Sequence, residues 1–395
     1  MSNIRLIKNG YAGEKAQVTD FDDIHSAKVR SFHAGFPGYE PTPLVKLSSL
    51  AENLGIGGIY IKDESRRFEL NAFKVLGGSF AIGSLIAEKL DEDISALPYD
   101  RLTGPEIREK LGEVTFITAT DGNHGRGVAW TANRLGQRSI VYMPAGTALE
   151  RLENIRKLGS DASITSMPYD DAVRKAGRDA DENGWILVQD TSLPGYEKVP
   201  RLIMQGYLTM ASEAAEQLGP VVPTHVFLQA GVGSMAAAVT GFLAAHYGEN
   251  RPKIIIVEPH CADCVYRTAK ANDGALHASE GKMDTIMAGL ACGEVCRPAW
   301  NVLQSHADYF GTMDDEAAAN AMRALAAGKD GDPAVVSGES GASGLGFALE
   351  ILGSDEHAEL RTMLGLDENS VILCFSTEGA TDRENYAKIT GIQLP

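Results

Sequence analysis

The stretch VTFITATDGNHGRGVAWTANRL, residues 114–135, decides the fold class that this sequence predicts. Val114–Ala119 is apolar or β-branched with no alternation of polar positions, which is typical of a strand buried on both faces. Glycines at 122, 125 and 127 follow, and residues 125–135 have the composition of a helix. A buried strand, a glycine-rich turn and a helix in this order form one unit of a parallel sheet covered by helices.

The same alternation continues along the chain and predicts an α/β fold. Further strands are expected at 139–143, 162–165, 186–188, 225–228, 254–257 and 371–375, and helices at 149–158, 170–182, 201–218, 235–246 and 316–327. Single cores stop growing at about 250–300 residues, so a chain of 395 residues predicts two domains. Ligands of such sheets bind beyond the carboxyl ends of the strands, which is where the glycine-rich loops lie.

Composition disfavours several classes of function. The chain has 36 Lys and Arg against 53 Asp and Glu, a formal charge of −17, and this repels nucleic acid and anionic membrane surfaces. Residues 226–248 carry no charge other than His and would be long enough to cross a bilayer, but the break AGVGS favours a strand, a turn and a buried helix. Residues 1–10 lack the apolar region of a secretory signal, so we expect a cytoplasmic protein.

Four segments carry candidate chemistry, and each is weak evidence alone. Lys74 in NAFKVLGG precedes an apolar helical run, where desolvation would free its amine for Schiff-base chemistry, although a lone Lys is more often at the surface. Residues 120–127 (TDGNHGRG) and 229–236 (QAGVGSMA) each join a strand to a helix through glycines, an arrangement that suits an anion. Ser376 and Thr377 end the last strand, where hydroxyls usually cap or meet solvent.

Taken together and in this order, the segments resemble the pyridoxal-phosphate enzymes of the tryptophan-synthase-β type (fold type II), a group that includes threonine deaminase and serine racemase. The resemblance covers nearly the whole chain, from PTPL at 41–44 through KDE at 62–64 to Ser376. Within the group, the sequence of these motifs is most similar to the branch that acts on 2,3-diaminopropionate. The stretches that support this are FELNAFK at 68–74, DGNHGRGVAW at 121–130, QDT at 189–191 and SGESGA at 337–342.

The resemblance implies how pyridoxal 5′-phosphate would be held. Lys74 would bind the cofactor covalently and later move protons, and Asn123 would hydrogen-bond the 3′-oxygen of the ring. Ser376, or as a second choice Thr377, would face the pyridine nitrogen, and a neutral hydroxyl there leaves that nitrogen mostly unprotonated. The cofactor phosphate would lie on Gly231, Val232, Gly233, Ser234 and Met235.

Asp121 departs from many members of the group, which have a neutral residue there. A carboxylate on the face opposite Lys74 could take the α-proton of the D-isomer, while Lys74 serves the L-isomer. Asp190 is a second acid near the implied pocket and would recognise the distal amine of a diamino substrate. The expected reaction is α,β-elimination of D- or L-2,3-diaminopropionate to pyruvate and two ammonia.

The resemblance also implies the domain organisation and the assembly. Residues 1–87 and 189–395 would form a large cofactor-binding domain and residues 88–188 a small domain, each with a mostly parallel sheet flanked by helices. The active site would lie in the cleft between them, and the chain would form a homodimer.

Several alternatives stay open. A threonine or serine dehydratase or a racemase of the same fold is the main one, since only Asp121 and Asp190 argue for a diamino substrate. A nicotinamide dehydrogenase using the GVG loop lacks the third glycine and the acid about 20 residues further on, and a non-catalytic binding protein would leave Lys74 idle. Three interpretations remain open for the cysteines at 261, 264, 292 and 296. Cys261, Cys264, Cys292 and Cys296 could form a zinc site of uncommon spacing, Cys264 could pair with Cys292, or all could be free thiols, which are usual in the cytoplasm.

Overall fold

The computed structural model describes residues 4–120 and 122–394. Contacts between Cα atoms divide the chain into two units, each discontinuous in sequence. Unit 1 consists of residues 1–23, 41–72 and 210–395, and unit 2 of residues 24–40 and 73–209. The predicted domain boundaries at 88 and 188, and the predicted cleft, stay predictions.

Unit 1 contains a seven-stranded sheet with the strand order β1-β10-β9-β8-β11-β3-β2. The five inner strands run parallel, and β1 and β2 close the two edges as antiparallel strands. The strands are β1 (Arg5–Lys8), β2 (Leu44–Lys46), β3 (Gly58–Asp63), β8 (His225–Gln229), β9 (Lys253–Pro259), β10 (Tyr309–Met313) and β11 (Val371–Ser376). Because β8 and β11 are parallel neighbours, their carboxyl ends, Gln229 and Ser376, lie at the same edge of the sheet.

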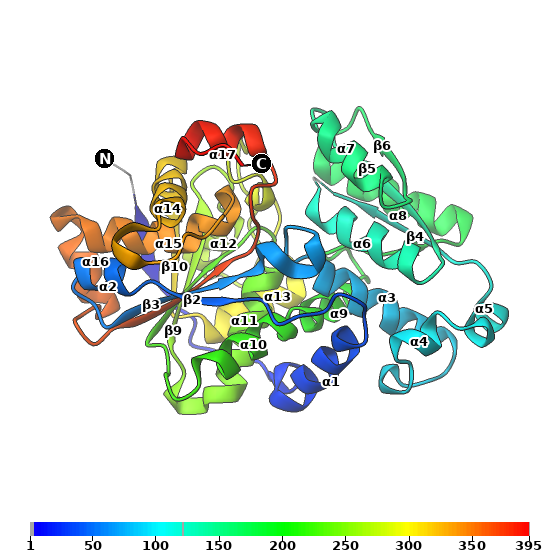
Figure 1. The fold of residues 1–395 in the computed structure, drawn as a ribbon, viewed down its shortest axis with the longest axis horizontal. Helices are drawn as coiled ribbons and strands as arrows, with labels where there is room; N and C mark the ends of the chain where they lie inside the picture. The colour runs from blue at the N-terminus through cyan, green and yellow to red at the C-terminus, as the bar shows by residue number, and fades with distance from the viewer. Residues whose placement is uncertain (1–3, 121, 395) are drawn as a thin grey trace. The chain divides into compact units, whose positions relative to one another are not determined.

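Helices cover both faces of this sheet (Figure 1), as is expected for parallel strands with helical crossovers. α15 packs on β8, β9 and β11, with α14 against it, while α11 packs against α13. A large apolar core lies between α15 and the sheet and includes Phe227, Phe347 and Ile372. The helices are α2 (Ser48–Asn53), α11 (Ser234–Tyr247), α12 (Cys264–Ala271), α13 (Arg297–His306), α14 (Asp315–Ala327), α15 (Glu339–Gly353), α16 (Ala358–Leu364) and α17 (Arg383–Thr390).

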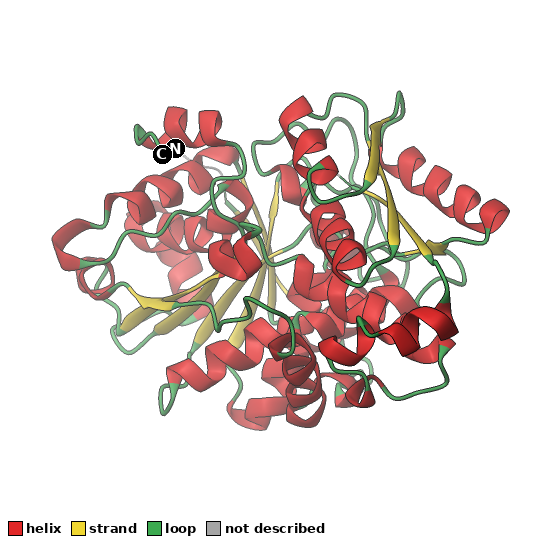
Figure 2. Cartoon of the chain, turned by 45° about the vertical axis from the view of Figure 1, so that its right-hand side comes forward, coloured by secondary structure: helices red, strands yellow, loops and turns green. Residues whose placement is uncertain are grey.

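Unit 2 contains a four-stranded parallel sheet with the order β6-β5-β4-β7 (Figure 2). Alternate residues of its strands point to opposite faces. Ile117 of β4 belongs to an apolar cluster with α8, whereas Val141 of β5 belongs to one with α6 and α7. The strands are β4 (Thr115–Ala119), β5 (Arg138–Met143), β6 (Asp161–Ile164) and β7 (Ile186–Leu187), and the helices are α1 (Asp23–Ala34), α3 (Val75–Lys89), α4 (Tyr99–Leu102), α5 (Pro105–Leu111), α6 (Asn123–Arg134), α7 (Leu149–Arg156), α8 (Tyr169–Asn183) and α9 (Lys198–Gly206).

The predicted fold class is confirmed, and most predicted elements lie within two residues of the observed ones. The single helix expected at 201–218 is wrong: the structure has α9 and a separate α10 (Leu208–Leu218). The break is at Tyr207, whose N–H bonds to the Met204 carbonyl three residues back and so tightens the last turn. The Tyr207 ring packs on Phe73 at 4.7 Å between ring centroids, which holds the chain at this corner.

The uncharged stretch that imitates a membrane span is divided between β8 and α11, as expected from its glycines. Throughout the part of the chain that the structure describes, no helix has both the length and the apolar character needed to cross a bilayer.

Candidate active site

Lys74 lies directly before α3 in unit 2, and its amine is paired with a carboxylate. The Nζ atom donates to Asp190 Oδ2 at 2.8 Å. The Lys74 side chain is 18% exposed and that of Asp190 is 6% exposed, so the pair is largely shielded from water. The two residues are far apart in the sequence, and the fold of unit 2 brings together two of the three predicted catalytic residues.

Asp190 is held as a carboxylate by its neighbours. Burial alone would raise the pKa of Asp190, but the charges of Lys74 and His124 outweigh burial and lower that pKa to about 2. His124 Nδ1 lies 4.0 Å from Asp190 Oδ2, and the opposite ring nitrogen, Nε2, is 2.8 Å from the Val188 carbonyl. Gln189 Nε2 donates to Asp190 Oδ1 at 3.3 Å. Lys74, His124 and Gln189 therefore surround the Asp190 carboxylate and orient it toward the Lys74 amine.

Helix α6 approaches the backbone at Lys74 very closely, and a glycine makes this possible. A Cβ atom on Gly127 would lie 2.8 Å from Val75 Cα and 3.1 Å from the Lys74 carbonyl oxygen. Real Cβ atoms essentially never lie as close as the first distance, and the second is tighter than most real contacts. The glycine-rich stretch expected to bind an anion thus has a second role, which is to position the backbone of Lys74.

Asn123, the predicted ligand of the 3′-oxygen, is the first residue of α6. It therefore stands at a helix N-terminus in the same unit as Lys74, where the first N–H groups have no acceptor within the helix. Asp121, the third predicted catalytic residue, lies outside the described residues, and its predicted role stays a prediction.

Unit 1 carries the predicted phosphate loop. Residues 230–233 join β8 to α11, and Gly233 has φ +94°, a left-handed conformation that favours glycine. The Val232 carbonyl accepts from the Cys296 N–H at 2.9 Å, and this bond fixes the loop to the residue that precedes α13. Ser234 and Met235 form the first turn of the 14-residue helix α11, whose positive end suits a phosphate.

The two predicted hydroxyls at the end of β11 have different partners. Ser376 Oγ donates to Ser337 Oγ at 2.8 Å, and both residues are 1% exposed. Thr377 Oγ1 instead accepts from Gln229 Nε2 at 2.9 Å, and the same amide donates to the Phe375 carbonyl at 2.8 Å. Sequence reasoning did not assign Gln229 or Ser337 to the site. The only signal was that Gln229 precedes the glycine loop and Ser337 begins SGESGA.

A buried charge network in unit 1 joins Lys62, Glu64 and Arg67, which precede Lys74 in the sequence, to Glu213, which follows it. Arg67 Nη2 lies 2.7 Å from Glu213 Oε2 and Arg67 Nε lies 2.9 Å from Glu64 Oε2. Lys62 Nζ lies 2.7 Å from the same oxygen of Glu213, and burial of Glu213 is outweighed by these cations, which lower its pKa to about 2. The network holds a short turn in which Glu69, although not a glycine, has φ +60°.

The residues present fit pyridoxal phosphate. The donor set contains a shielded primary amine, a glycine cradle at a helix N-terminus and buried hydroxyls, which match an aldehyde, a phosphate and a pyridine ring. The two halves of this set lie in different units. No group of three or more His, Cys, Asp or Glu side chains that could hold a metal is found among the described residues, and all five cysteines are present as thiols.

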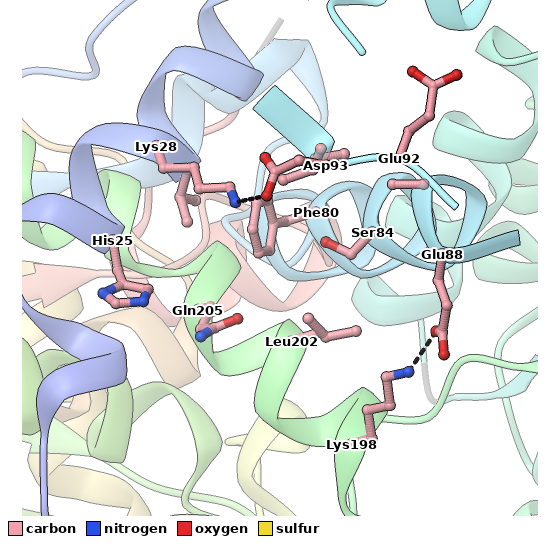
Figure 3. Close-up of a pocket in the computed structure, with 13 residues that line it drawn as sticks. His25, Lys28, Phe80, Ser84, Glu88, Glu92, Asp93, Lys198, Leu202 and Gln205 are labelled. Atoms are coloured by element: carbon pink, nitrogen blue, oxygen red, sulfur yellow. Dashed lines mark hydrogen bonds and ion pairs between the residues drawn. The ribbon is translucent and has the colours of Figure 1, made fainter. Parts of the chain in front are cut away.

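A pocket of about 470 Å³ in unit 2 contains none of the predicted site residues (Figure 3). Helices α1, α3 and α9 line it, with Phe80 and Leu202 among its apolar residues. Lys28 pairs with Asp93 at 2.8 Å, and Lys198 pairs with Glu88. Glu92, the remaining acid of the pocket, pairs with Arg101. Each lysine and carboxylate that lines the pocket therefore already has a partner, and the chemistry points to the Lys74 site instead.

Comparisons with known proteins identify the family of the chain. The family described as pyridoxal-phosphate dependent enzyme matches residues 36–359. The diaminopropionate ammonia-lyase of Salmonella typhimurium LT2 is 49% identical over 92% of this chain and 91% of its own length, and that of Escherichia coli K12 is 46% identical over 93% and 92%. The crystal structure of the holo form of the Escherichia coli enzyme superposes with a TM-score of 0.92 at 43% identity, covering 98% of this chain and 97% of that one. The same enzyme in complex with an aminoacrylate-PLP azomethine reaction intermediate gives a TM-score of 0.90 at 43% identity, covering 99% and 97%.

Proposed function

We propose a reaction for this chain, which belongs to the pyridoxal-phosphate dependent enzymes and, within them, to the diaminopropionate ammonia-lyase family. The chain is a carbon–nitrogen lyase that converts D- and L-2,3-diaminopropionate and water to pyruvate and two molecules of ammonia. The observation that carries the proposal is the shielded ion pair of Lys74 and Asp190, joined at 2.8 Å in the unit that also holds Asn123.

Pyridoxal phosphate, when bound through an amine, withdraws electrons from the α-carbon of that amine and makes its hydrogen acidic. Lys74 would hold the cofactor through Nζ, and residues 231–235 would bind its phosphate through backbone N–H groups. Asn123 would bind the 3′-oxygen and Ser376 the ring nitrogen, with Thr377 as the second choice.

Lys74 would move the α-proton of the L-isomer, because its amine becomes free once the substrate amine has taken its place. Asp121 would take the α-proton of the D-isomer from the opposite face. A β-amine leaves poorly unless it is protonated, and a carboxylate beside it favours the ammonium form. Asp190, a buried carboxylate within 2.8 Å of the Lys74 amine, is the acid residue proposed to bind that ammonium.

The decisive experiment labels the amine that holds the cofactor. Borohydride reduction of the holoenzyme followed by digestion and mass spectrometry should find a pyridoxyl group on Lys74. Lys74→Ala should lose the label and the turnover, whereas Lys89→Ala, at the exposed end of α3, should keep both. A label elsewhere, or none, would overturn the proposal.

A substrate panel tests the diamino assignment. The wild-type chain should eliminate ammonia from both enantiomers of 2,3-diaminopropionate faster than it acts on serine or threonine. Asp121→Asn should reduce turnover of the D-isomer far more than that of the L-isomer, and equal losses would remove the assignment of faces. Serine or threonine as the best substrate would instead favour a dehydratase or a racemase of the same fold.

We also propose the oligomeric state and the cellular location of the chain, and both rest on its resemblance to the family. The chain would work in the cytoplasm as a homodimer. Light scattering coupled to size exclusion measures the mass in solution, and a value matching one chain would refute the homodimer.

A further inference from the structure

The side chain of Ser376 is hydrogen-bonded to that of another serine. Ser376 Oγ donates to Ser337 Oγ at 2.8 Å, and the two residues are 39 positions apart in the chain. Both are 1% exposed, so bulk water does not compete for this bond. The contact joins the end of β11 to the residues that lead into α15.

The backbone around the two serines is packed too tightly for them to separate. The Gly338 N–H donates to the Glu378 carbonyl at 2.9 Å, which ties the residue after Ser337 to the loop after Ser376. A Cβ atom on Gly341 would lie 2.8 Å from the Glu378 carbonyl oxygen and 2.9 Å from Ser337 Oγ. The first turn of α15 can therefore reach this loop only because residue 341 is glycine.

Two hydroxyls in contact have a property that a hydroxyl next to an amide lacks. Each hydroxyl carries one proton and can accept as well as donate, so the bond between Ser337 and Ser376 can run in either direction. An amide NH₂ group can only donate, so Gln229 leaves the Thr377 oxygen an acceptor in every state. Only the serine pair can therefore reverse.

We propose that Ser337 is a positioning residue that sets the hydrogen bond between Ser376 and the ring nitrogen of pyridoxal phosphate. The inference rests on the proposed function, in which Ser376 faces that nitrogen. When the nitrogen is unprotonated, Ser337 donates to Ser376 and Ser376 donates to the ring. When the nitrogen is protonated, the ring donates to Ser376 and Ser376 donates to Ser337, across the 2.8 Å that separates the two oxygens.

Removal of the Ser337 hydroxyl affects both states in the same direction. With an unprotonated ring, Ser376 loses the bond that polarises its O–H and becomes a weaker donor. With a protonated ring, the Ser376 proton is left in a buried site without Ser337 as its acceptor, which disfavours that state. Both effects move the ring nitrogen toward the free, unprotonated form.

The test uses holoenzyme reconstituted with pyridoxal phosphate labelled with ¹⁵N in the ring. Ser337→Ala should move the ring ¹⁵N resonance downfield, and cofactor affinity measured by fluorescence titration of the apo chain should fall about fivefold, the effect of one net hydrogen bond. Ser337→Cys, which keeps the size of the side chain but donates weakly, should move the resonance in the same direction.

Ser343→Ala is the matched control. Ser343 is buried in α15, the helix that follows Ser337, and its Oγ donates to the Ser340 carbonyl at 2.6 Å. This variant should keep the wild-type resonance. An unchanged resonance in Ser337→Ala and Ser337→Cys would overturn the inference, even with a lower affinity. A wild-type chain that binds no pyridoxal phosphate would refute the proposed function itself, and the inference with it.

Discussion

Replacing Gly127 by alanine tests whether helix α6 positions the reactive lysine. The added Cβ would lie 2.8 Å from Val75 Cα and 3.0 Å from Val75 N. Carbon atoms in contact normally lie about 3.5–4.0 Å apart, so the backbone at residues 74–75 must move by about 0.7–1 Å. The close partners are backbone atoms, which cannot swing away as a side chain would.

The magnitude follows from two opposing terms. Inserting a methyl group into a packed contact costs about 1–3 kcal/mol, and alanine in place of a helical glycine regains up to about 1 kcal/mol. We expect a net loss of about 1–2 kcal/mol in the free energy of unfolding. The loss of activity should be larger, since a displacement of about 1 Å at a reacting group lowers the rate about 100-fold.

The assay compares turnover of 2,3-diaminopropionate, cofactor absorbance and urea unfolding in the variant and a control. Gly177→Ala in α8 is the control, because its Cβ would meet only Leu187 and Leu193 side chains at 3.9 Å. It should unfold at the same or a higher urea concentration and keep full turnover. Wild-type turnover in Gly127→Ala would refute the reasoning, since it would mean that Lys74 does not depend on this contact.

Three further predictions concern stability and are checked by unfolding measurements. Burial, with the nearby charge of Glu378, raises the pKa of Glu339 to about 6, so the free energy of unfolding should fall as the pH rises from about 4.5 through 6. Glu339→Gln should therefore raise the free energy of unfolding by about 2 kcal/mol at pH 8 and change it little at pH 4. An equal increase at both pH values would contradict the raised pKa. Glu69→Gly should raise the free energy of unfolding by about 1 kcal/mol because φ is +60° there, whereas Glu69→Ala should not. Arg67→Ala should cost about 3–5 kcal/mol, since it leaves two buried carboxylates facing one lysine, and the exposed neighbour variant Arg66→Ala should cost almost nothing.

The elements that sequence reasoning found are those whose local composition agrees with their place in the fold. β4, β8 and β11 are nearly unbroken runs of apolar and β-branched residues, so their burial on both faces was predictable. α15 was missed because ESGASGLGFALEILG contains four glycines, which suggest a loop. The structure explains three of them: a Cβ on Gly341, Gly344 or Gly346 would lie 2.5–2.8 Å from a backbone carbonyl oxygen of a neighbouring element, so close packing outweighs helix propensity.

The candidate site was predictable as separate motifs but not as a set of contacts. Lys74, the glycine loop at 231–235 and Ser376 stand in stretches whose order identifies the family. The bond of Lys74 with Asp190 spans 116 residues, and that of Ser376 with Ser337 spans 39. No local pattern fixes such distances, because they depend on how closely helices approach one another and the sheet.

Two close approaches beside the proposed reactive groups share one physical device. Gly127 brings α6 onto the backbone at Lys74, and Gly341 brings the first turn of α15 onto the loop after Ser376. Each glycine inside a helix costs about 0.5–1 kcal/mol relative to alanine, so both positions lower stability unless a contact requires them. A side chain at either place would have to push backbone atoms that carry a proposed reactive group. Backbone atoms cannot change rotamer, and a contact between them therefore holds a reacting atom more narrowly than a contact between side chains. Replacing a helical glycine that contacts backbone atoms beside the site by alanine should therefore lower turnover more than stability. Replacing a glycine that contacts only side chains should not lower turnover in this way.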